Sequence, residues 1–209
     1  MRSGTASIKA TYTDGARRLA SRSITGLART RVTPSMLTAA GVSLCALAAV
    51  LVYFEYRNEW LFFWLGAVVF VVGSLLDILD GALARAGGKS TPFGAFLDST
   101  TDRIGEAFML GAIAAALARD GNETAFLFVF AALAGSFLVS YTRSKAEALG
   151  LRGDVGIGSR AERVVVITAG LVFAPWGGLQ WAVYFLTATA WLTVAQRIWH
   201  VRRQLRAQM

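Results

Sequence analysis

Residues 77–102 read DILDGALARAGGKSTPFGAFLDSTTD and place four carboxylates in or beside two strongly apolar segments. Asp77 and Asp80 belong to the first segment, and Asp98 and Asp102 belong to the second. An ionised side chain costs about 2.5–3.5 kcal/mol at the centre of a membrane helix, so such residues are candidates for function. Four carboxylates together need a cationic partner, and a divalent cation is the simplest one. The stretch predicts a metal centre within a membrane protein.

The spacing of these residues predicts how they share metal. Positions 77, 80, 81 and 84 lie on one face of a helix, and positions 94, 98 and 102 lie on one face of the next. If the two helices pack antiparallel through the short turn between them, both carboxylate pairs meet. Gly81, Ala84 and Gly94 leave room beside the acids for metals and for the phosphates of a ligand. Ligation by oxygen alone suits Mg²⁺ or Mn²⁺.

The composition supports an integral membrane protein with one domain. Of the 209 residues, 55% are hydrophobic and only 16% are charged. The single Cys45 provides no disulfide framework. The first thirty residues are polar and basic, which argues against a cleavable signal peptide.

The hydrophobic pattern predicts an all-α protein with six transmembrane helices, preceded by an amphipathic juxtamembrane helix in residues 3–31. We expect a cytoplasmic, interfacial segment at 1–32, a six-helix domain at 33–200 and a basic C-terminal tail at 201–209. The expected spans are residues 36–54, 60–84, 94–118, 124–141, 163–173 and 179–199.

The distribution of basic residues predicts the orientation in the membrane. In the six-span arrangement, every lysine and arginine lies on one side except Arg57, Arg103 and Arg119. An excess of basic residues marks the cytoplasmic side, so we expect both termini and the acidic cluster to face the cytoplasm of the cell membrane. Membrane topology thus explains the net charge of +8 without a nucleic-acid partner.

The motif Asp77-x-x-Asp80-Gly81-x-x-Ala84-Arg85, followed by Gly94-x-x-x-Asp98-x-x-x-Asp102, resembles the signature of the CDP-alcohol phosphotransferases. The resemblance implies a homodimeric membrane enzyme with two Mg²⁺ or Mn²⁺ ions per active site. Asp77, Asp80 and Asp98 are then metal ligands, and Asp102 completes the metal site and takes the proton of the attacking hydroxyl. The resemblance also implies a set of residues that hold the CDP group: Gly81, Ala84 and Arg85, with Thr33, Pro34 and Thr38.

The basic segment between the fourth and fifth expected spans is similar to the bacterial phosphatidylinositol-phosphate synthases. These enzymes transfer the phosphatidyl group of CDP-diacylglycerol to inositol 1-phosphate, giving phosphatidylinositol phosphate and CMP. A guanidinium at an apolar boundary is well suited to hold a phosphate. The resemblance implies an acceptor-phosphate pocket built from Ser140, Arg143, Lys145, Arg160, Arg163 and Arg197.

Two other functions remain open at this point. Glycerol 3-phosphate also presents a dianionic phosphate, so a phosphatidylglycerophosphate synthase is the alternative within the family. An ion-coupled transporter would also use acids buried in the membrane. The sequence has no evident inverted repeat, which argues against a transporter.

Overall fold

The structure is a computed structural model that describes residues 33–86 and 91–207. These residues form six α-helices and two short 3₁₀ helices, and they contain no strand. The predicted amphipathic helix and the rest of segment 1–32 lie outside the described residues. The elements are α2 (Pro34–Tyr53), η1 (Glu55–Arg57), α3 (Glu59–Ala86), α4 (Pro92–Arg119), α5 (Glu123–Ala148), α6 (Arg160–Val172), η2 (Ala174–Trp176) and α7 (Gly178–Ala207).

Side-chain caps define where four of the helices begin. Thr33 caps α2 and Thr91 caps α4, and each is followed by a proline in the first helical turn. The Asn122 side chain accepts a hydrogen bond from Ala125 N at the start of α5. Ser159 forms a capping box with Glu162 at the start of α6. The capping box fixes the helical turn that carries Arg160, a residue of the predicted site.

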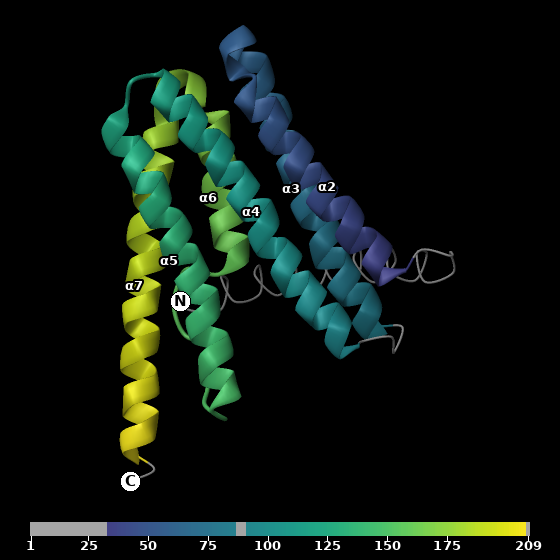
Figure 1. The fold of residues 1–209 in the computed structure, drawn as a ribbon, viewed down its shortest axis with the longest axis vertical. Coiled ribbons are helices and arrows are strands. Elements are labelled where there is room, and N and C mark those ends of the chain that lie inside the picture. The colour runs from purple at the N-terminus through teal and green to yellow at the C-terminus, as the bar shows by residue number, and fades with distance from the viewer. Residues whose placement is uncertain (1–32, 87–90, 208–209) are drawn as a thin grey trace, which may run out of the picture.

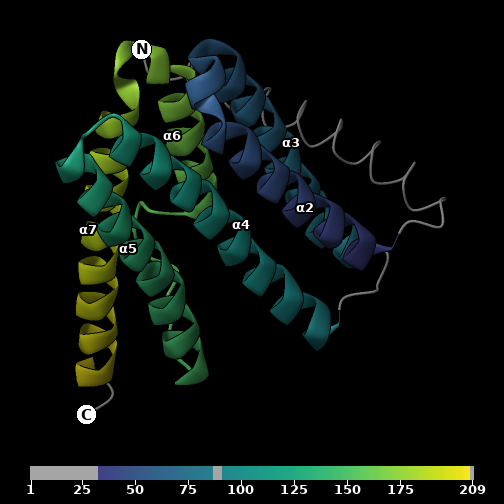
Figure 2. The same ribbon diagram turned by 45° about the horizontal axis from the view of Figure 1, so that its top comes forward.

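The helices form a bundle in which α2 packs against both α3 and α4, as Figures 1 and 2 show. Helices α5 and α7 pack together along the other side, and α6 packs against α7 and α3. The carboxylate pairs were predicted to meet if α3 and α4 pack antiparallel. These two helices contact each other over a small part of their length, because α2 makes the main contacts with both of them.

Glycines at the crossing of α2 and α3 let the two backbones approach closely. A Cβ atom placed on Gly41 would lie 3.0 Å from the carbonyl oxygen of Gly73. One placed on Gly73 would lie 2.9 Å from the carbonyl oxygen of Gly41. Any side chain larger than hydrogen at either position would push the helices apart. The close crossing lies about one helical turn from Asp77, so it bears on how the carboxylates are held.

Within residues 33–86 and 91–207, three helices are long and apolar enough to cross a membrane: Ser35–Arg57, Glu59–Asp80 and Glu123–Ala148. The all-helical prediction is confirmed, whereas the full set of six spans remains a prediction. Helix α7 continues to Ala207, so most of the expected C-terminal tail is a helical extension.

Candidate active site

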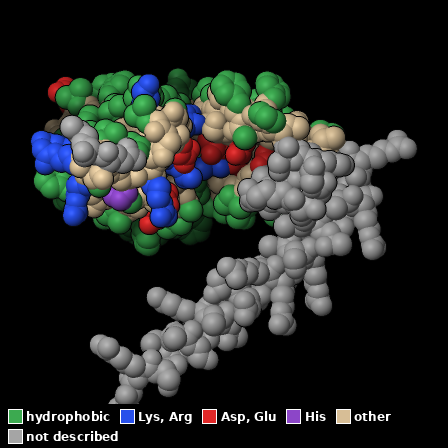
Figure 3. All heavy atoms as spheres, turned by 90° about the horizontal axis from the view of Figure 1, so that it is seen from below, with side chains coloured by type: hydrophobic (Ala, Val, Ile, Leu, Met, Phe, Trp, Pro, Cys, Tyr) green, Lys and Arg blue, Asp and Glu red, His purple; other side chains and the backbone are tan. Residues whose placement is uncertain are grey.

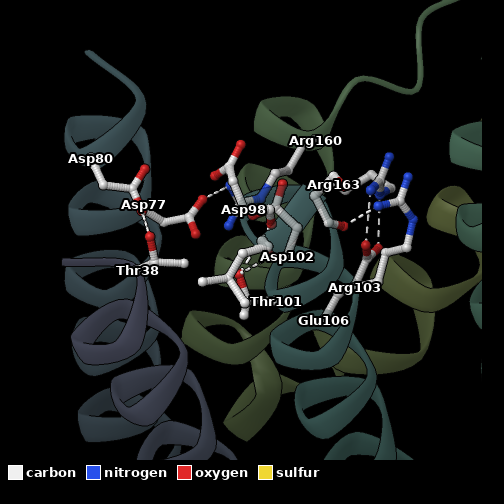
Figure 4. Close-up of polar contacts among 12 residues, drawn as sticks. Thr38, Asp77, Asp80, Asp98, Thr101, Asp102, Arg103, Glu106, Arg160 and Arg163 are labelled. Atoms are coloured by element: carbon white, nitrogen blue, oxygen red, sulfur yellow. Dashed lines mark hydrogen bonds and ion pairs between the residues drawn. The ribbon is translucent and has the colours of Figure 1, made fainter. Parts of the chain in front are cut away.

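Three of the four carboxylates come together between α3 and α4. Asp77 projects from α3, and Asp98 and Asp102 project from successive turns of α4. Each offers an oxygen, and these oxygens all lie within 4.8 Å of one another. Figure 4 shows the three side chains directed toward a common region. Acids more than twenty residues apart in sequence therefore share one site.

Asp80 lies outside that group of three and contacts α2 instead. Its side chain is buried, and its Oδ2 accepts a hydrogen bond from the Thr38 hydroxyl. Thr38 is itself 5% exposed. The Thr38 hydroxyl on α2 thus orients Asp80 on α3. This contact is possible because α2 lies beside both helices that carry the acids. The predicted contact of Thr38 with the CDP group remains a prediction.

Arg160 places a positive charge among the carboxylates. Its Nη1 donates a hydrogen bond to Asp77 Oδ2 and lies 2.6 Å from Asp102 Oδ1. The Arg160 side chain is 30% exposed, so it is reached from one side by solvent. The carboxylates in this arrangement accept a cation between α3 and α4 (Figure 4). We predicted that Arg160 would bind the acceptor phosphate, and in this structure it pairs with acids.

The group of acids fits a divalent metal. The donors are all carboxylate oxygens, as Mg²⁺ and Mn²⁺ prefer, and they are close enough to bind a common ion after small side-chain rotations. Within this group, Asp77 and Asp102 also balance the positive charge of Arg160.

A polar cavity of about 440 Å³ opens beside the acids. In Figure 3, acidic and basic side chains meet across the middle of the face seen from below, with hydrophobic side chains on both sides. Asp154 lies at this cavity outside the helices. A hydrogen bond from its own backbone, followed by the charge of Arg152, lowers the pKa of Asp154 below its usual value. Among the residues that line the cavity are Asp98, Asp102, Arg103, Ser140, Arg143, Arg160, Arg163 and Arg197.

Two of the predicted phosphate-binding arginines are buried and make strong contacts within the protein. Arg163 pairs with Glu106 through two hydrogen bonds of 2.7 and 2.8 Å. Arg197 donates from Nε to the carbonyl oxygen of Val155 at 2.8 Å and from Nη1 to that of Val139. Both line the cavity, so their predicted contact with the acceptor stays a prediction.

The other predicted acceptor residues lie on α5. Ser140 and Arg143 line the cavity, and Arg143 pairs with Glu147 at 2.9 Å on an exposed part of the helix. Lys145 is exposed and does not line the cavity. The structure therefore brings Ser140 and Arg143 to the acids, but not Lys145.

The predicted CDP-binding residues lie near the ends of α2 and α3. Thr33 is exposed, and its hydroxyl accepts a hydrogen bond from Met36 N at 3.3 Å as the cap of α2. Pro34 is the first residue of α2. Gly81, Ala84 and Arg85 belong to the last turns of α3, and their side chains lie outside what the structure describes. Their roles remain predictions.

Glu106 is a residue of this region that we did not predict. It extends the series 94, 98 and 102 by one further step of four residues, so it belongs to the same face of α4 as the acids. That regular spacing was a visible signal. The pairing of Glu106 with Arg163, 57 residues later, was not visible in sequence.

An apolar groove of about 740 Å³ was also not predicted. It lies between α3 and α6 and begins at Ser159 and Arg160, next to the carboxylates. Its walls are mainly hydrophobic side chains, including Val71, Leu75, Ile78, Val164, Val165 and Phe173.

Residues 31–199 match the family of the CDP-alcohol phosphatidyltransferases. This match covers most of the chain, and the chain belongs to that family. The family assignment confirms that the protein is a transferase and not an ion-coupled transporter.

Relatives and solved structures of this family are similar to the chain over most of its length. The phosphatidylinositol phosphate synthase of Mycolicibacterium smegmatis is 40% identical over 185 residues, which are 83% of this chain and 79% of that protein. The fold is similar to that of the phosphatidylinositol phosphate synthase of Mycobacterium tuberculosis in two crystal structures. The structure with CDP-DAG bound has a TM-score of 0.78 and 29% identity, with 88% of this chain and 94% of that chain covered. The structure with manganese and citrate has a TM-score of 0.76 and 30% identity, with 87% and 88% covered.

Proposed function

We propose that this protein transfers the phosphatidyl group of CDP-diacylglycerol to inositol 1-phosphate, producing phosphatidylinositol phosphate and CMP. The observation that carries the proposal is a group of three carboxylates that opens on a cavity lined by arginines. The acids suit a metal-bound diphosphate, and the arginines suit a second, phosphorylated substrate. The relatives named above support this pairing of donor and acceptor.

Asp77, Asp80, Asp98 and Asp102 would hold the metal. We propose two Mg²⁺ or Mn²⁺ ions, and the tuberculosis relative in complex with manganese supports a divalent metal of this kind. Bound metal would neutralise the diphosphate and stabilise the attacking and leaving oxygens. Thr38 would keep Asp80 oriented through the hydrogen bond between α2 and α3.

The transfer itself is a displacement at the phosphorus that bears the diacylglycerol. A hydroxyl of the acceptor forms the new P–O bond, and the bond from that phosphorus to the oxygen it shares with CMP breaks. CMP leaves with that oxygen. Asp102 would take the proton of the attacking hydroxyl, and its position at the border between the carboxylate group and the polar cavity supports this role. Arg160 would balance the charge of Asp77 and Asp102.

The donor lipid would bind along α3. The apolar groove between α3 and α6 starts beside Arg160 and offers about 740 Å³ for acyl chains. The CDP group would then lie at the last turns of α3, near Gly81, Ala84 and Arg85, with Thr33 and Pro34 at the start of α2. In this proposal the diphosphate would lie between the groove and the polar cavity.

The acceptor phosphate would lie in the polar cavity against Ser140, Arg143 and Arg197. Arg143 is half exposed and can turn from Glu147 toward a phosphate. Glycerol 3-phosphate carries the same phosphate on a smaller polyol, so it is the second candidate acceptor. Lys145 is exposed and does not line the cavity, so it would only attract the anion from a distance.

We further propose a homodimer in the cell membrane, with six spans and with both termini and the active site on the cytoplasmic side. The distribution of basic residues supports this orientation. Of the described arginines, Arg143 and Arg160 line the cavity beside the carboxylates, Arg152 lies between α5 and α6, and those at positions 202, 203 and 206 lie in the last turns of α7.

The proposal is tested by measuring CMP release from CDP-diacylglycerol with purified protein. The acceptors are inositol 1-phosphate, glycerol 3-phosphate and unphosphorylated inositol, each with Mg²⁺, with Mn²⁺ and with a chelator. We expect metal-dependent release with inositol 1-phosphate and little with inositol, because inositol offers no phosphate to Arg143 and Arg197. A preference for glycerol 3-phosphate would establish the alternative acceptor, and equal release in the chelator would contradict the role of the carboxylates.

A further inference from the structure

A buried ion pair lies one helical turn below the carboxylate group. Glu106 is 8% exposed and Arg163 is 6% exposed. Arg163 donates from Nε to Glu106 Oε1 at 2.7 Å and from Nη2 to Glu106 Oε2 at 2.8 Å (Figure 4). Burying two charges is costly, and similar apolar side chains often replace such a pair without loss of stability. The pair therefore calls for an explanation other than stability.

The third contact of Arg163 gives that explanation. Its Nη1 donates a hydrogen bond of 2.9 Å to the carbonyl oxygen of Gly158. Gly158 precedes Ser159, the cap of α6, and Ser159 precedes Arg160. Glu106 thus holds Arg163, and Arg163 holds the backbone at the point where the chain enters α6.

Charged side chains connect α4 and α6 at two levels, and the Glu106–Arg163 ion pair forms the lower one. At the upper level, Asp102 pairs with Arg160 at 2.6 Å. At the lower level, Glu106 lies four residues after Asp102, and Arg163 lies three residues after Arg160. Each step is about one helical turn, so the lower pair fixes the separation and rotation of the two helices at the upper pair. Arg160 is thereby placed among the carboxylates.

The opposite side of the same segment is held by α7. Arg197 donates to the carbonyl oxygen of Val155, and Cβ atoms placed on Gly156 and Gly158 would lie 2.4 and 2.8 Å from atoms of Thr193. The segment from 155 to 159 is therefore fixed between α4, α6 and α7. Gly156, Gly158 and Ser159 line the polar cavity, so this segment forms one of its walls.

We propose that Glu106 is a positioning residue for the acceptor: through Arg163 and the Gly158 carbonyl, it sets the wall of the polar cavity. This inference rests on the proposed function, which assigns that cavity to a phosphorylated acceptor. Glu106 does not itself line the polar cavity, whereas Arg163 does. The bidentate pairing with Arg163 also compensates the negative charge of Glu106, which would otherwise repel the acceptor phosphate. Arg163 accordingly serves the acceptor mainly by holding the wall in place.

The first test is Glu106→Gln, which keeps the shape of the side chain and removes its charge. We expect the KM for the acceptor to rise about tenfold, the effect of losing one charge-assisted hydrogen bond, while the KM for CDP-diacylglycerol changes less than about twofold. The acceptor KM of Glu106→Asp should fall between that of the unmodified enzyme and that of Glu106→Gln. Equal increases in both KM values would overturn the proposal.

The second test separates positioning from stability. In the double variant Glu106→Leu with Arg163→Met, an apolar pair replaces the ion pair, so we expect a Tm close to that of the unmodified enzyme. Nothing then holds the Gly158 carbonyl, so the KM for the acceptor should stay high. A double variant with native Tm and native acceptor KM would overturn the proposal.

The readouts are arranged so that two failures can be told apart. The KM values for the donor and for the acceptor are measured with whichever phosphorylated acceptor the unmodified enzyme uses. If the proposed acceptor is wrong, the unmodified enzyme already fails to use it, and this result does not depend on Glu106. If turnover of a variant falls below detection, the Tm increase caused by each substrate is measured instead. An increase retained for CDP-diacylglycerol and lost for the acceptor supports the role of Glu106, and loss of both contradicts it.

Discussion

Replacing Asp98 with Asn should increase stability without metal and abolish activity with metal. The oxygens of Asp77, Asp98 and Asp102 lie within 4.8 Å of one another. Two like charges at that distance repel each other by about 3–4 kcal/mol at an effective dielectric constant of 20. Asp98 experiences this repulsion from Asp77 and Asp102, and the pairing of those two acids with Arg160 offsets a large part of it. We expect a net gain of about 1–2 kcal/mol in the metal-free variant, allowing for that attraction.

The assay is thermal unfolding of the purified protein in detergent, with a chelator and with Mn²⁺. A gain of 1 kcal/mol raises the Tm of a protein of this size by about 2–4 °C. Mn²⁺ at a hundred times its Kd should add about 2.7 kcal/mol to the unmodified protein, or about 5–10 °C, and this increase should vanish in Asp98→Asn. Turnover should fall at least about a hundredfold, since such a loss needs only about 3 kcal/mol of transition-state stabilisation.

The matched control is Glu123→Gln, a carboxylate in the first turn of α5 that is not part of the carboxylate group. This variant should lose slight stability in the chelator and keep the full increase with Mn²⁺. The reasoning is refuted if Asp98→Asn has a lower Tm in the chelator and keeps its increase with Mn²⁺. That pattern would mean that Asp98 supports the fold and does not hold metal.

Three further predictions follow from the packing of α2 and from the orientation. Thr38→Val should reduce kcat/KM about ten- to a hundredfold by removing the hydrogen bond to Asp80, whereas Thr38→Ser should keep most activity; full activity in the Val variant would contradict this. Gly73→Ala should destabilise the protein by about 1–3 kcal/mol, measured as a lower Tm, whereas Gly111→Ala meets nothing within 4 Å and should not; equal Tm values would contradict the close crossing. In a Cys45→Ala background, a cysteine at Asn122 should react with impermeant reagents outside intact cells and one at Arg202 should not; the reverse pattern would invert the topology.

The sequence allowed the acids and the helices to be predicted because both depend on local spacing. Asp98 and Asp102 meet Asp77, as the step of four residues indicated, whereas Asp80 contacts Thr38 instead. The first and third expected spans, at 36–54 and 94–118, fall within helices that begin at Pro34 and Pro92. The position of α2 was not predictable in this way. It depends on the close contact between glycines that lie 32 residues apart, and single glycines in an apolar helix give no clear signal.

The arginines show the limit of sequence reasoning most clearly. Arg163 and Arg197 stand at apolar boundaries, where an inward-facing guanidinium suits a phosphate. The structure shows that both are already engaged, one by Glu106 and Gly158 and the other by Val155 and Val139. Backbone carbonyl partners cannot be recognised from residue types, because every residue carries one. The contacts of each arginine, and not its residue type, therefore show which part of the protein it holds in place.

The most direct test of the account is to follow the phosphorus of the acceptor into the product. Purified protein is incubated with CDP-diacylglycerol, Mn²⁺ and inositol 1-phosphate labelled at its phosphate, and the lipid and water-soluble fractions are separated. We predict that the label enters the lipid fraction with one CMP released for each labelled lipid, and that neither occurs in Asp102→Asn. Release of CMP while the label stays in the water-soluble fraction would contradict transfer to this acceptor.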